Sequence, residues 1–369
     1  MTSSAVPESL RYRVFEFMAV GGATLVLFPL AWLVRGWLGL DPSEYAVGFL
    51  TFYAAYVIND PHFAVTYLLF YKDAKKRAFA AEFSLVQRIR YWLAGLLVPG
   101  ALCVWAGAAL TLHSAQALGW MVQLMYLLVG WHYVKQGFGV LTVLSARRGV
   151  RVSTQERSVL LVHCYAGWAY AWASPAMAAG EFEEKGIVYR ALAHPRWLEQ
   201  VTGAVFAMST IALVVVLALG RLRGRRSLPI APLSGLLITV WSWTIYSSID
   251  PLMRYLIPGL HSIQYLYFVW LMKRNEAREE EAPPFFGRPV HVRLLVLALS
   301  ATALGWLLFH GAPGFLDDVF VPHGRHRAID ALGETPYVAA FFVIVSIHHY
   351  FMDNVIWRRD NPDTQYLRA

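Results

Sequence analysis

Charged residues are scarce in this sequence. Only 15% of its 369 residues are Asp, Glu, Lys or Arg, whereas 57% are hydrophobic and the mean hydropathy is +0.44. A soluble protein needs a surface on which about 25–35% of the residues are charged, so the composition excludes an ordinary water-soluble fold. We therefore predict an all-α, polytopic transmembrane helix bundle in which residues 1–369 form a single integral-membrane helical domain.

Cysteine is also rare. The only two cysteines, Cys103 and Cys164, both lie within apolar segments, which argues against a disulfide framework and against a thiolate metal site. An apolar segment begins at Val14, and no small-residue cleavage pattern follows it. Because this segment is too long for the core of a signal peptide, we expect it to be retained as the first helix.

Long apolar runs dominate the rest of the chain. Runs long enough to cross the hydrocarbon core of a bilayer lie at 14–40, 45–71, 91–113, 117–146, 156–178, 200–220, 232–250, 251–274, 292–311 and 335–358. They predict about ten transmembrane helices.

Basic residues mark the ends of the even-numbered runs. They lie at 72–77, 147–151, 221–226, 273–274 and 358–359. Because cytoplasmic loops carry an excess of Lys and Arg, both termini are expected to be cytoplasmic. The net charge of +8 then reflects topology and attraction to the membrane lipid bilayer, and no nucleic acid partner is expected. The expected location is the bacterial inner (plasma) membrane.

Histidines lie deep inside four of these runs. They are His62, His132, His261 and the adjacent pair His348 and His349. Each lies about 9–15 residues from the basic end of its run, or about 14–22 Å at the helical rise, so all of them share one layer of the bundle. Ionisable groups at membrane depth are costly and usually functional, which makes this layer the candidate site.

Each of these runs has a polar residue one helical turn after a histidine. The pairs are His62 with Thr66, His132 with Lys135 and Gln136, His261 with Gln264, and His349 with Asp353. Positions three or four apart share a helix face. The histidines are therefore predicted to be metal ligands, with the side chains of Thr66, Gln136 and Gln264 orienting them. His348 and His349 point about 100° apart, so one is expected to be a ligand and the other a packing or second-site residue.

Three charged residues complete the predicted site. Asp60, Lys135 and Asp353 each cost about 2.5–3.5 kcal/mol at membrane depth, and we predict catalytic roles for them. Asp60 and Pro61 immediately precede His62, and a proline there kinks the helix and frees carbonyl groups. Asp60 is accordingly a candidate ligand, helix cap or proton acceptor.

Other histidines give weaker signals. His163 lies near the cytoplasmic end of its run, where interfacial packing is at least as good an explanation as metal ligation. His323 and His326 have a spacing compatible with metal binding, but they belong to an expected outer loop, and a surface loop is the favoured interpretation. A single buried histidine is usually a hydrogen-bonded core residue, so the functional hypothesis depends on finding four such helices at one depth.

Nitrogen-rich ligand sets with carboxylates favour iron, zinc or copper over magnesium or calcium. The predicted cofactor is non-haem iron, as one or two ions, because oxidation of an unactivated lipid carbon needs a redox metal and dioxygen. Zinc is the less favoured metal. The predicted protein is a metal-dependent membrane oxidoreductase, of the oxygen-dependent hydroxylase or desaturase type. It would act on an apolar or lipid-like substrate and receive electrons from a cytoplasmic donor.

The His348-His349 pair, the histidines near the inner ends of spans and the cytoplasmic termini resemble the integral-membrane non-haem di-iron enzymes. These are the fatty acid desaturases, the sterol and fatty acid hydroxylases, and the alkane hydroxylases. The resemblance implies iron and oxygen chemistry. The HxxxH and HxxHH boxes of those families are absent here, and the HxxH of His323 and His326 lies on the predicted outer side. The ligands would therefore come singly from more helices.

Two other functions are compatible with the same layer. A proton-coupled membrane transporter would use the histidines with Asp60, Asp353 and Lys135 as a proton path. A bis-histidine haem electron carrier would hold haem between His132 and His261 on facing helices. Transport driven by a pH gradient without bound metal would favour the first, and a sharp Soret band would favour the second.

Overall fold

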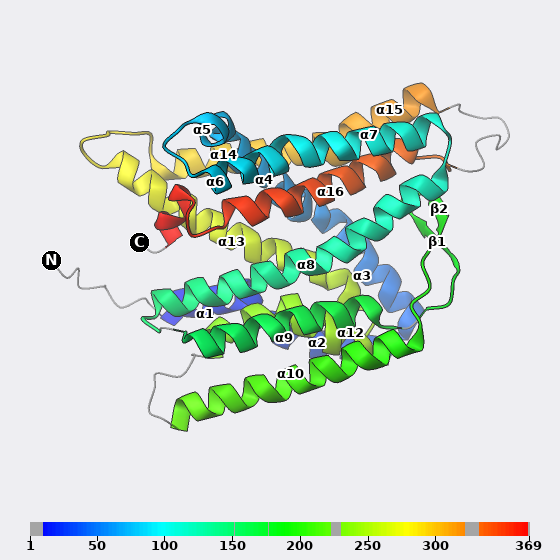
Figure 1. Cartoon of the computed structure of the whole chain (residues 1–369), viewed down its shortest axis with the longest axis horizontal. Coiled ribbons are helices and arrows are strands. Elements are labelled where there is room, and N and C mark those ends of the chain that lie inside the picture. The colour runs from blue at the N-terminus through cyan, green and yellow to red at the C-terminus, as the bar shows by residue number, and fades with distance from the viewer. Residues whose placement is uncertain (1–9, 151, 176, 223–229, 322–331, 368–369) are drawn as a thin grey trace.

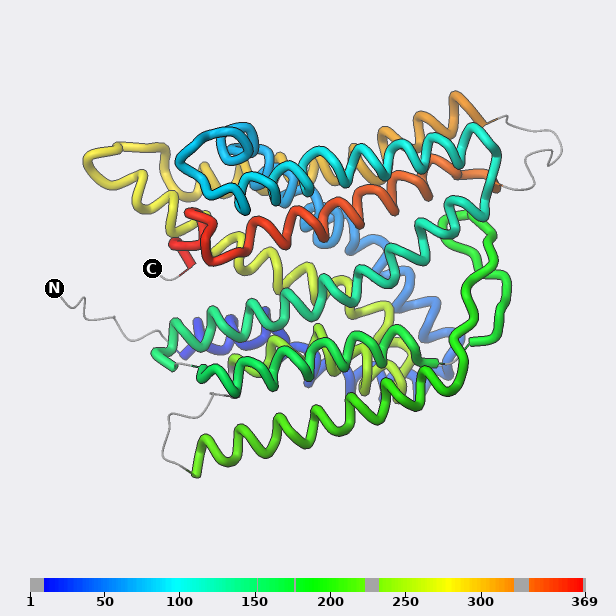
Figure 2. Tube along the Cα trace, in the orientation of Figure 1, coloured from blue at the N-terminus to red at the C-terminus, as the bar shows by residue number. Residues whose placement is uncertain are grey.

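The computed structural model describes residues 10–150, 152–175, 177–222, 230–321 and 332–367. Nearly all regular structure within these ranges is helical, so the all-α prediction is confirmed. The long helices run roughly side by side along the long axis of the molecule, and the first and last described helices lie at the same end of it (Figure 1). The alternating direction of successive long helices is easiest to follow in the chain trace (Figure 2).

The helical segments up to residue 173 are α1 (Leu10–Phe17), η1 (Met18–Gly22), α2 (Thr24–Leu38), α3 (Leu40–Ala55), α4 (Asn59–Lys72), α5 (Ala74–Phe79), α6 (Leu85–Trp92), η2 (Leu93–Leu97), α7 (Val98–Thr111), α8 (Ala115–Arg147) and α9 (Thr154–Ala173). The elements that follow are β1 (Glu181–Glu184), β2 (Ile187–Arg190), α10 (Arg196–Leu222), α11 (Ile230–Leu233), η3 (Leu237–Tyr246), α12 (Ser247–Ile249), α13 (Met253–Glu281), α14 (Val290–Trp306), η4 (Leu307–Gly311), α15 (Ala312–Phe320), α16 (Pro336–Ile356) and η5 (Pro362–Leu367). The segments η1 to η4 are π-helical, and η5 is a 3-10 helix.

The apolar runs of the sequence are largely helical, but several of them are broken. The described helices that are long and apolar enough to cross a membrane are Leu85–Thr111, Arg196–Leu222, Val290–Phe320 and Pro336–Ile356. The pair Leu10–Gly22 and Thr24–Leu38, bent by 60°, makes a fifth if it is one span. The other runs are divided by breaks or are less apolar, so the count of about ten spans stays a prediction.

The bend in the first run lies at Gly21. This residue has a φ of +150°, and a Cβ atom here would lie 2.0 Å from the backbone oxygen of Ser234. Only glycine permits such a close approach of two backbone segments together with this φ. The first run is therefore a bent pair of helices packed against the segment before η3.

A second break separates α3 from α4 and positions His62. Because α3 ends at Ala55 and α4 begins at Asn59, Pro61 lies in the first turn of α4, where its missing N–H needs no partner. The sequence predicted a kink at Pro61 itself, whereas the interruption lies at 56–58. No side-chain hydrogen bond caps α4, so the role of helix cap considered for Asp60 is not found.

A β-hairpin occupies the connection between α9 and α10. Strands β1 and β2 pair antiparallel, with Glu184 opposite Ile187. The two residues between them, Lys185 and Gly186, both have positive φ angles, of 50° and 79°, as a type I′ turn requires. The hairpin lies at the end of the molecule opposite to α1 and η5 (Figure 1).

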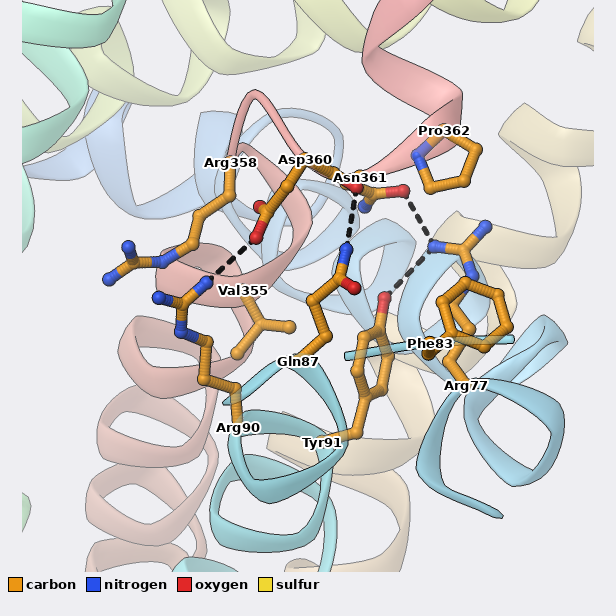
Figure 3. Close-up of a pocket in the computed structure, with 10 residues that line it drawn as sticks. All are labelled: Arg77, Phe83, Gln87, Arg90, Tyr91, Val355, Arg358, Asp360, Asn361 and Pro362. Atoms are coloured by element: carbon orange, nitrogen blue, oxygen red, sulfur yellow. Dashed lines mark hydrogen bonds and ion pairs between the residues drawn. The ribbon is translucent and has the colours of Figure 1, made fainter. Parts of the chain in front are cut away.

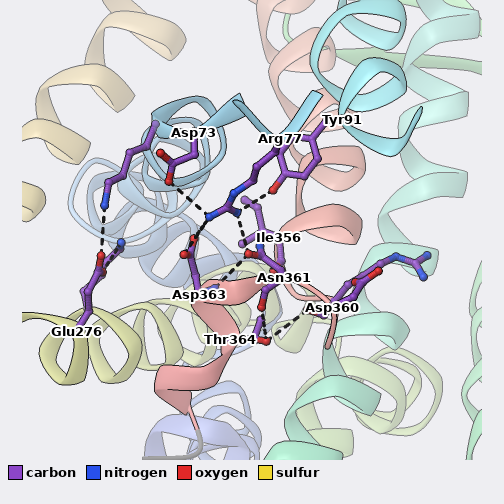
Figure 4. A network of polar contacts seen from close by, with 12 residues as sticks. Asp73, Arg77, Tyr91, Glu276, Ile356, Asp360, Asn361, Asp363 and Thr364 are labelled. Atoms are coloured by element: carbon purple, nitrogen blue, oxygen red, sulfur yellow. Dashed lines mark hydrogen bonds and ion pairs between the residues drawn. The ribbon is translucent and has the colours of Figure 1, made fainter. Parts of the chain in front are cut away.

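The end of α16 is held against α5 and α6 by a network around Arg77 (Figure 4). The buried guanidinium of Arg77 donates hydrogen bonds to Tyr91 Oη at 2.9 Å and to Asn361 Oδ1 at 2.7 Å. It also donates to the two carboxylate oxygens of Asp363 at 3.0 and 2.9 Å. The network fixes the C-terminal end of the helix that carries His349.

Replacement of Arg77 by alanine is expected to destabilise the protein by about 2–4 kcal/mol, because Asn361 and Asp363 lose their donor. The matched control is Arg90→Ala. Arg90 and Arg77 line one small pocket (Figure 3), and the 3.0 Å ion pair between Arg90 and Asp360 is partly exposed. That change should cost less than about 1 kcal/mol. Thermal unfolding of both variants in detergent micelles measures the difference. Equal losses would contradict the structural role of the buried network.

Candidate metal centre

Four helices pack around one point in the middle of the bundle. Helix α16 lies against both α4 and α8, and α13 lies against α4. Apolar side chains of α16 are buried on both sides of this point, with Val343 and Ile347 before it and Met352 and Val355 after it. These contacts fix which face of each helix is turned inward at the level of the histidines.

The inward faces bring four imidazole rings together. His62 belongs to α4, His132 to α8, His261 to α13 and His349 to α16, and each side chain is at most 3% exposed. The Nε2 atoms of His132 and His261 are 3.0 Å apart. The ring centroid of His349 lies 4.5 Å from that of His62 and 4.9 Å from that of His132. Histidines from four separate helices therefore meet at one place.

Several nitrogens of these rings have no hydrogen-bond partner among the described residues. They are Nε2 of His62, Nδ1 of His261 and both ring nitrogens of His349. Buried polar atoms in native proteins nearly always have a partner, and an unsatisfied one costs about 1–3 kcal/mol. A cluster of such atoms needs a further partner, and a metal ion suits the lone pairs of neutral imidazoles.

Asp353 adds a carboxylate to the same cluster. Its Oδ2 lies 3.5 Å from His349 Nε2 and 3.7 Å from His132 Nδ1. Its Oδ1 accepts a hydrogen bond of 2.7 Å from the hydroxyl group of Tyr265, whose oxygen is also 2.6 Å from Thr66 Oγ1. Tyr265 and Thr66 thus orient the carboxylate and leave Oδ2 directed at the histidines.

The potential ligand atoms fall into two overlapping groups. In one group, atoms of His62, His132 and His261 all lie within 4.8 Å of one another, and in the other group the same holds for His132, His349 and Asp353. Metal–nitrogen bonds of about 2.0–2.1 Å place two ligands of a tetrahedral ion about 3.3 Å apart. Small side-chain adjustments would therefore close either group around an ion.

Aromatic rings hold two of the imidazoles in place. Tyr133 stacks on His261, with ring centroids 3.8 Å apart, and Tyr350 stacks on His132 at 4.8 Å. Both tyrosine side chains are themselves buried. The stacking restricts ring rotation and keeps water away from the cluster, which strengthens electrostatic interactions inside it.

Asp60, a predicted catalytic residue, lies outside the cluster. Its Oδ2 is 2.8 Å from Nε2 of His310, whose ring stacks on Tyr56 at 4.2 Å. Asp60 lies two positions before His62, which turns its side chain about 200° around the helix axis and away from the cluster. The structure gives no support to Asp60 as a ligand of this centre. Its role as a proton acceptor stays a prediction.

Lys135 and His348 are two further predicted site residues, and neither shows a contact with the four clustered imidazoles that would support its predicted role. Lys135 is half-buried and forms no hydrogen bond or ion pair with the residues that the structure describes, so its contacts give no support to a catalytic role. His348 Nε2 lies 2.9 Å from the backbone oxygen of Ala94, and its Nδ1 lies 3.0 Å from Tyr67 Oη. Because the turn of α16 directs His349 inward, His348 packs against η2, as the packing alternative for one residue of this pair expected.

Gln136 and Gln264 lie beside the cluster but bind each other. Gln136 Nε2 donates to Gln264 Oε1 at 2.9 Å, and Gln264 Nε2 donates to the backbone oxygen of Val20 at 2.5 Å. These amides connect α8, α13 and η1, and they do not orient an imidazole as expected. For His62 that role falls to Ser262, whose hydroxyl oxygen is 3.2 Å from Nδ1.

His163 is a hydrogen-bonded core residue. Trp241 Nε1 donates to its Nε2 at 3.0 Å, and Ser209 Oγ lies 3.2 Å from its Nδ1. With both nitrogens partnered, the packing interpretation accounts for this histidine. His323 and His326 lie outside the described residues.

Sequence reasoning missed Tyr265 as a member of the centre. This residue was not singled out from the sequence, although Tyr265 follows His261 by four positions. The same spacing had identified Asp353 after His349, so a signal for a hydroxyl group on this helix face was present. Ser262 had no such signal, because its contact with His62 depends on how α4 and α13 pack.

Comparisons with known proteins found no matching protein-family model, no matching curated protein and no matching solved structure. The case for a function therefore depends on the geometry of the centre.

Proposed function

We propose that this chain is a metal-dependent integral-membrane oxidoreductase, of the oxygen-dependent hydroxylase or desaturase type, that acts on a lipid-like substrate. The observation that carries the proposal is the cluster of buried imidazoles and one carboxylate, in which several ring nitrogens have no hydrogen-bond partner among the residues that the structure describes. Nitrogen-rich sites of this kind bind iron, copper and zinc. A purely structural core would satisfy these nitrogens with hydrogen bonds, as the protein does at His163.

Non-haem iron is the proposed metal, and zinc is the alternative. The Nε2 atoms of His132 and His261 are 3.0 Å apart. This separation suits neighbouring ligands of one ion, at about 3.3 Å, better than the opposite axial ligands of a haem iron, at about 4 Å. Hydroxylation of a C–H bond consumes dioxygen, two electrons and two protons, and it yields an alcohol and water. Bound iron would supply the dioxygen chemistry, and Asp353, held by the hydroxyl group of Tyr265, would be the carboxylate of the centre.

An aromatic approach to the cluster supports a lipid-like substrate. The ring centroid of Phe63 lies 4.7 Å from that of His349 and 5.2 Å from that of Phe309. The ring centroid of Phe309 lies 6.4 Å from that of Phe342. Phe309 belongs to η4 within the apolar helix Val290–Phe320, most of which is not buried inside the protein. These rings connect the centre to a surface that would face hydrocarbon, where an apolar substrate resides.

The proposed placement is a multi-pass arrangement of about ten helices in the bacterial inner membrane, with both termini in the cytoplasm. Helices α4, α8 and α16 end at the same end of the molecule as α1 and η5 (Figure 2), and basic residues follow each of them. Such residues favour the cytoplasmic side. Trp357 directly follows the last residue of α16, and its ring centroid lies 5.3 Å from that of Tyr265. These two rings offer electrons from a cytoplasmic donor a short route to the centre.

A proton-coupled transporter is the second candidate function. The hydrogen bond between Asp60 and His310 favours it, because this pair lies apart from the histidine cluster and the His310 side chain is 31% exposed. A histidine beside a carboxylate is suited to exchange protons between a surface and an interior. Under this alternative, Asp60→Asn would abolish pH-driven transport in vesicles. Under the oxidoreductase proposal, it would leave the metal content unchanged.

Elemental analysis and oxygen uptake test the proposal together. Protein purified anaerobically in detergent from iron-replete cells should contain about one or two equivalents of iron, and it should consume oxygen when given membrane lipid and a reductant. His132→Ala should lose both the iron and the oxygen uptake. His291→Ala, which removes an exposed histidine of α14, should retain them. Metal-free, folded wild-type protein would move the assignment to the transporter.

A further inference from the structure

His132 faces both groups of potential ligands through opposite ring nitrogens. Its Nε2 lies 3.0 Å from His261 Nε2, whereas its Nδ1 lies 3.7 Å from Asp353 Oδ2. Among the described residues, His132 is the member that the two groups share. An ion in the first group would bind Nε2 of this ring, and an ion in the second group would bind Nδ1.

A single ion does not serve all of these side chains. His349 is not a member of the group formed by His62, His132 and His261, although its ring lies 4.9 Å from that of His132. Each group also contains nitrogens without partners, namely Nε2 of His62 and Nδ1 of His261 in the first and both nitrogens of His349 in the second. An ion in one group alone would leave the buried nitrogens of the other unsatisfied.

We propose that the centre holds two divalent metal ions bridged by the imidazole ring of His132. One ion is bound by His62, His261 and Nε2 of His132, and the other by His349, Asp353 and Nδ1 of His132. This inference rests on the proposed metal centre and goes beyond it in the number of ions and in the identity of the bridging group.

Bridging converts the ring of His132 into an imidazolate. Each ring nitrogen forms one bond to a metal ion, and the N–H proton of the ring leaves to water, so binding of the second ion releases one proton from this ring. Two bonds of about 2.0–2.1 Å on opposite sides of the ring separate the ions by about 6 Å. Two-metal sites that clamp a substrate hold their ions closer, at about 3.5–4 Å. The distance between the ions therefore distinguishes an imidazolate-bridged pair from a substrate-clamping pair.

Packing holds the bridging ring in the required orientation. Tyr350 stacks on His132, with an angle of 25° between the ring planes and a centroid distance of 4.8 Å. The hydroxyl group of Tyr265 fixes Oδ1 of Asp353, which leaves Oδ2 for the second ion. The negative charges of the imidazolate and of Asp353 offset part of the charge of the two ions in a buried site.

Copper titration of the demetallated full-length protein in detergent tests the number of ions. Equilibrium dialysis followed by elemental analysis should find two Cu²⁺ ions per chain in the wild type. His261→Ala and Asp353→Ala should each retain one ion, because each removes a ligand from only one group. His291→Ala, which changes an exposed histidine, should retain two. Elution from a size-exclusion column at the wild-type volume shows that a variant is folded.

Electron paramagnetic resonance of the same samples tests the bridge. Two Cu²⁺ ions joined by an imidazolate couple antiferromagnetically, so the wild type should give much less signal at low temperature than its copper content implies. Each single-ion variant should give the full signal of one isolated Cu²⁺. Two ions with additive, uncoupled signals would overturn the bridge. A single bound ion in the wild type would overturn the proposed bridge and leave the proposed metal centre intact. The absence of any bound ion would overturn both the bridge and the metal centre.

Discussion

Replacement of His349 by leucine is expected to stabilise the metal-free protein by about 1–3 kcal/mol and to abolish metal binding by this residue. Both ring nitrogens of His349 are buried without a hydrogen-bond partner among the described residues, and an unsatisfied buried group costs about 1–3 kcal/mol. Leucine is of similar size and needs no partner. Because most core substitutions destabilise a protein, a stabilising effect here would be diagnostic of a site kept for binding.

The matched control for this substitution is His163→Leu. His163 is equally buried, but both of its nitrogens have partners in Trp241 and Ser209. Its replacement leaves Trp241 Nε1 without its acceptor and should cost about 1–3 kcal/mol. Thermal unfolding of both variants, demetallated and in one detergent, gives the comparison. Equal destabilisation by the two changes would mean that the cluster is an ordinary polar core.

Metal loading is expected to raise the Tm of the wild-type protein by about 3–5 °C. An ion present at 100–1,000 times its Kd contributes about 2.7–4.1 kcal/mol to folding, and a chain of this length gains about 1 °C for each 0.8 kcal/mol. His132→Ala should show no increase, because His132 belongs to both ligand groups. Scanning fluorimetry of demetallated protein with and without Fe²⁺, under anaerobic conditions, measures the shift.

An equal Tm increase in His132→Ala would show that the ion binds elsewhere. His291→Ala is the matched control, since it removes an exposed histidine at the start of α14 and should show the wild-type increase. A cluster that lowers the stability of the empty protein and raises that of the loaded protein is the usual compromise between stability and function.

The position of the cluster was predictable because helical geometry fixes depth. The spacing from the basic ends placed His62, His132, His261 and His349 in one layer, and the four side chains meet there. The same geometry indicated that His348 and His349 face different directions. Which of the two faces inward depends on the packing of α16 against α4 and α8, and sequence spacing contains no information about that packing.

Other features depend on contacts between distant segments. The partner of Asp60 is His310, which lies 250 positions away in η4, and neither run predicts that pairing. The bend at Gly21 depends on the approach of Ser234. The hairpin turn at Lys185 and Gly186 has a weaker local signal than Asn-Gly or Asp-Gly, so the sequence did not indicate a hairpin there.

The central claim is that imidazoles from separate helices bind metal in the middle of the bundle. X-ray absorption at the iron edge of the loaded protein tests it most directly, because imidazole rings give a characteristic outer-shell scattering. The account predicts nitrogen and oxygen ligands at about 2.0–2.2 Å, with scattering from at least two imidazole rings per ion. An oxygen-only shell without imidazole scattering, as given by hydrated iron on a surface, would contradict it.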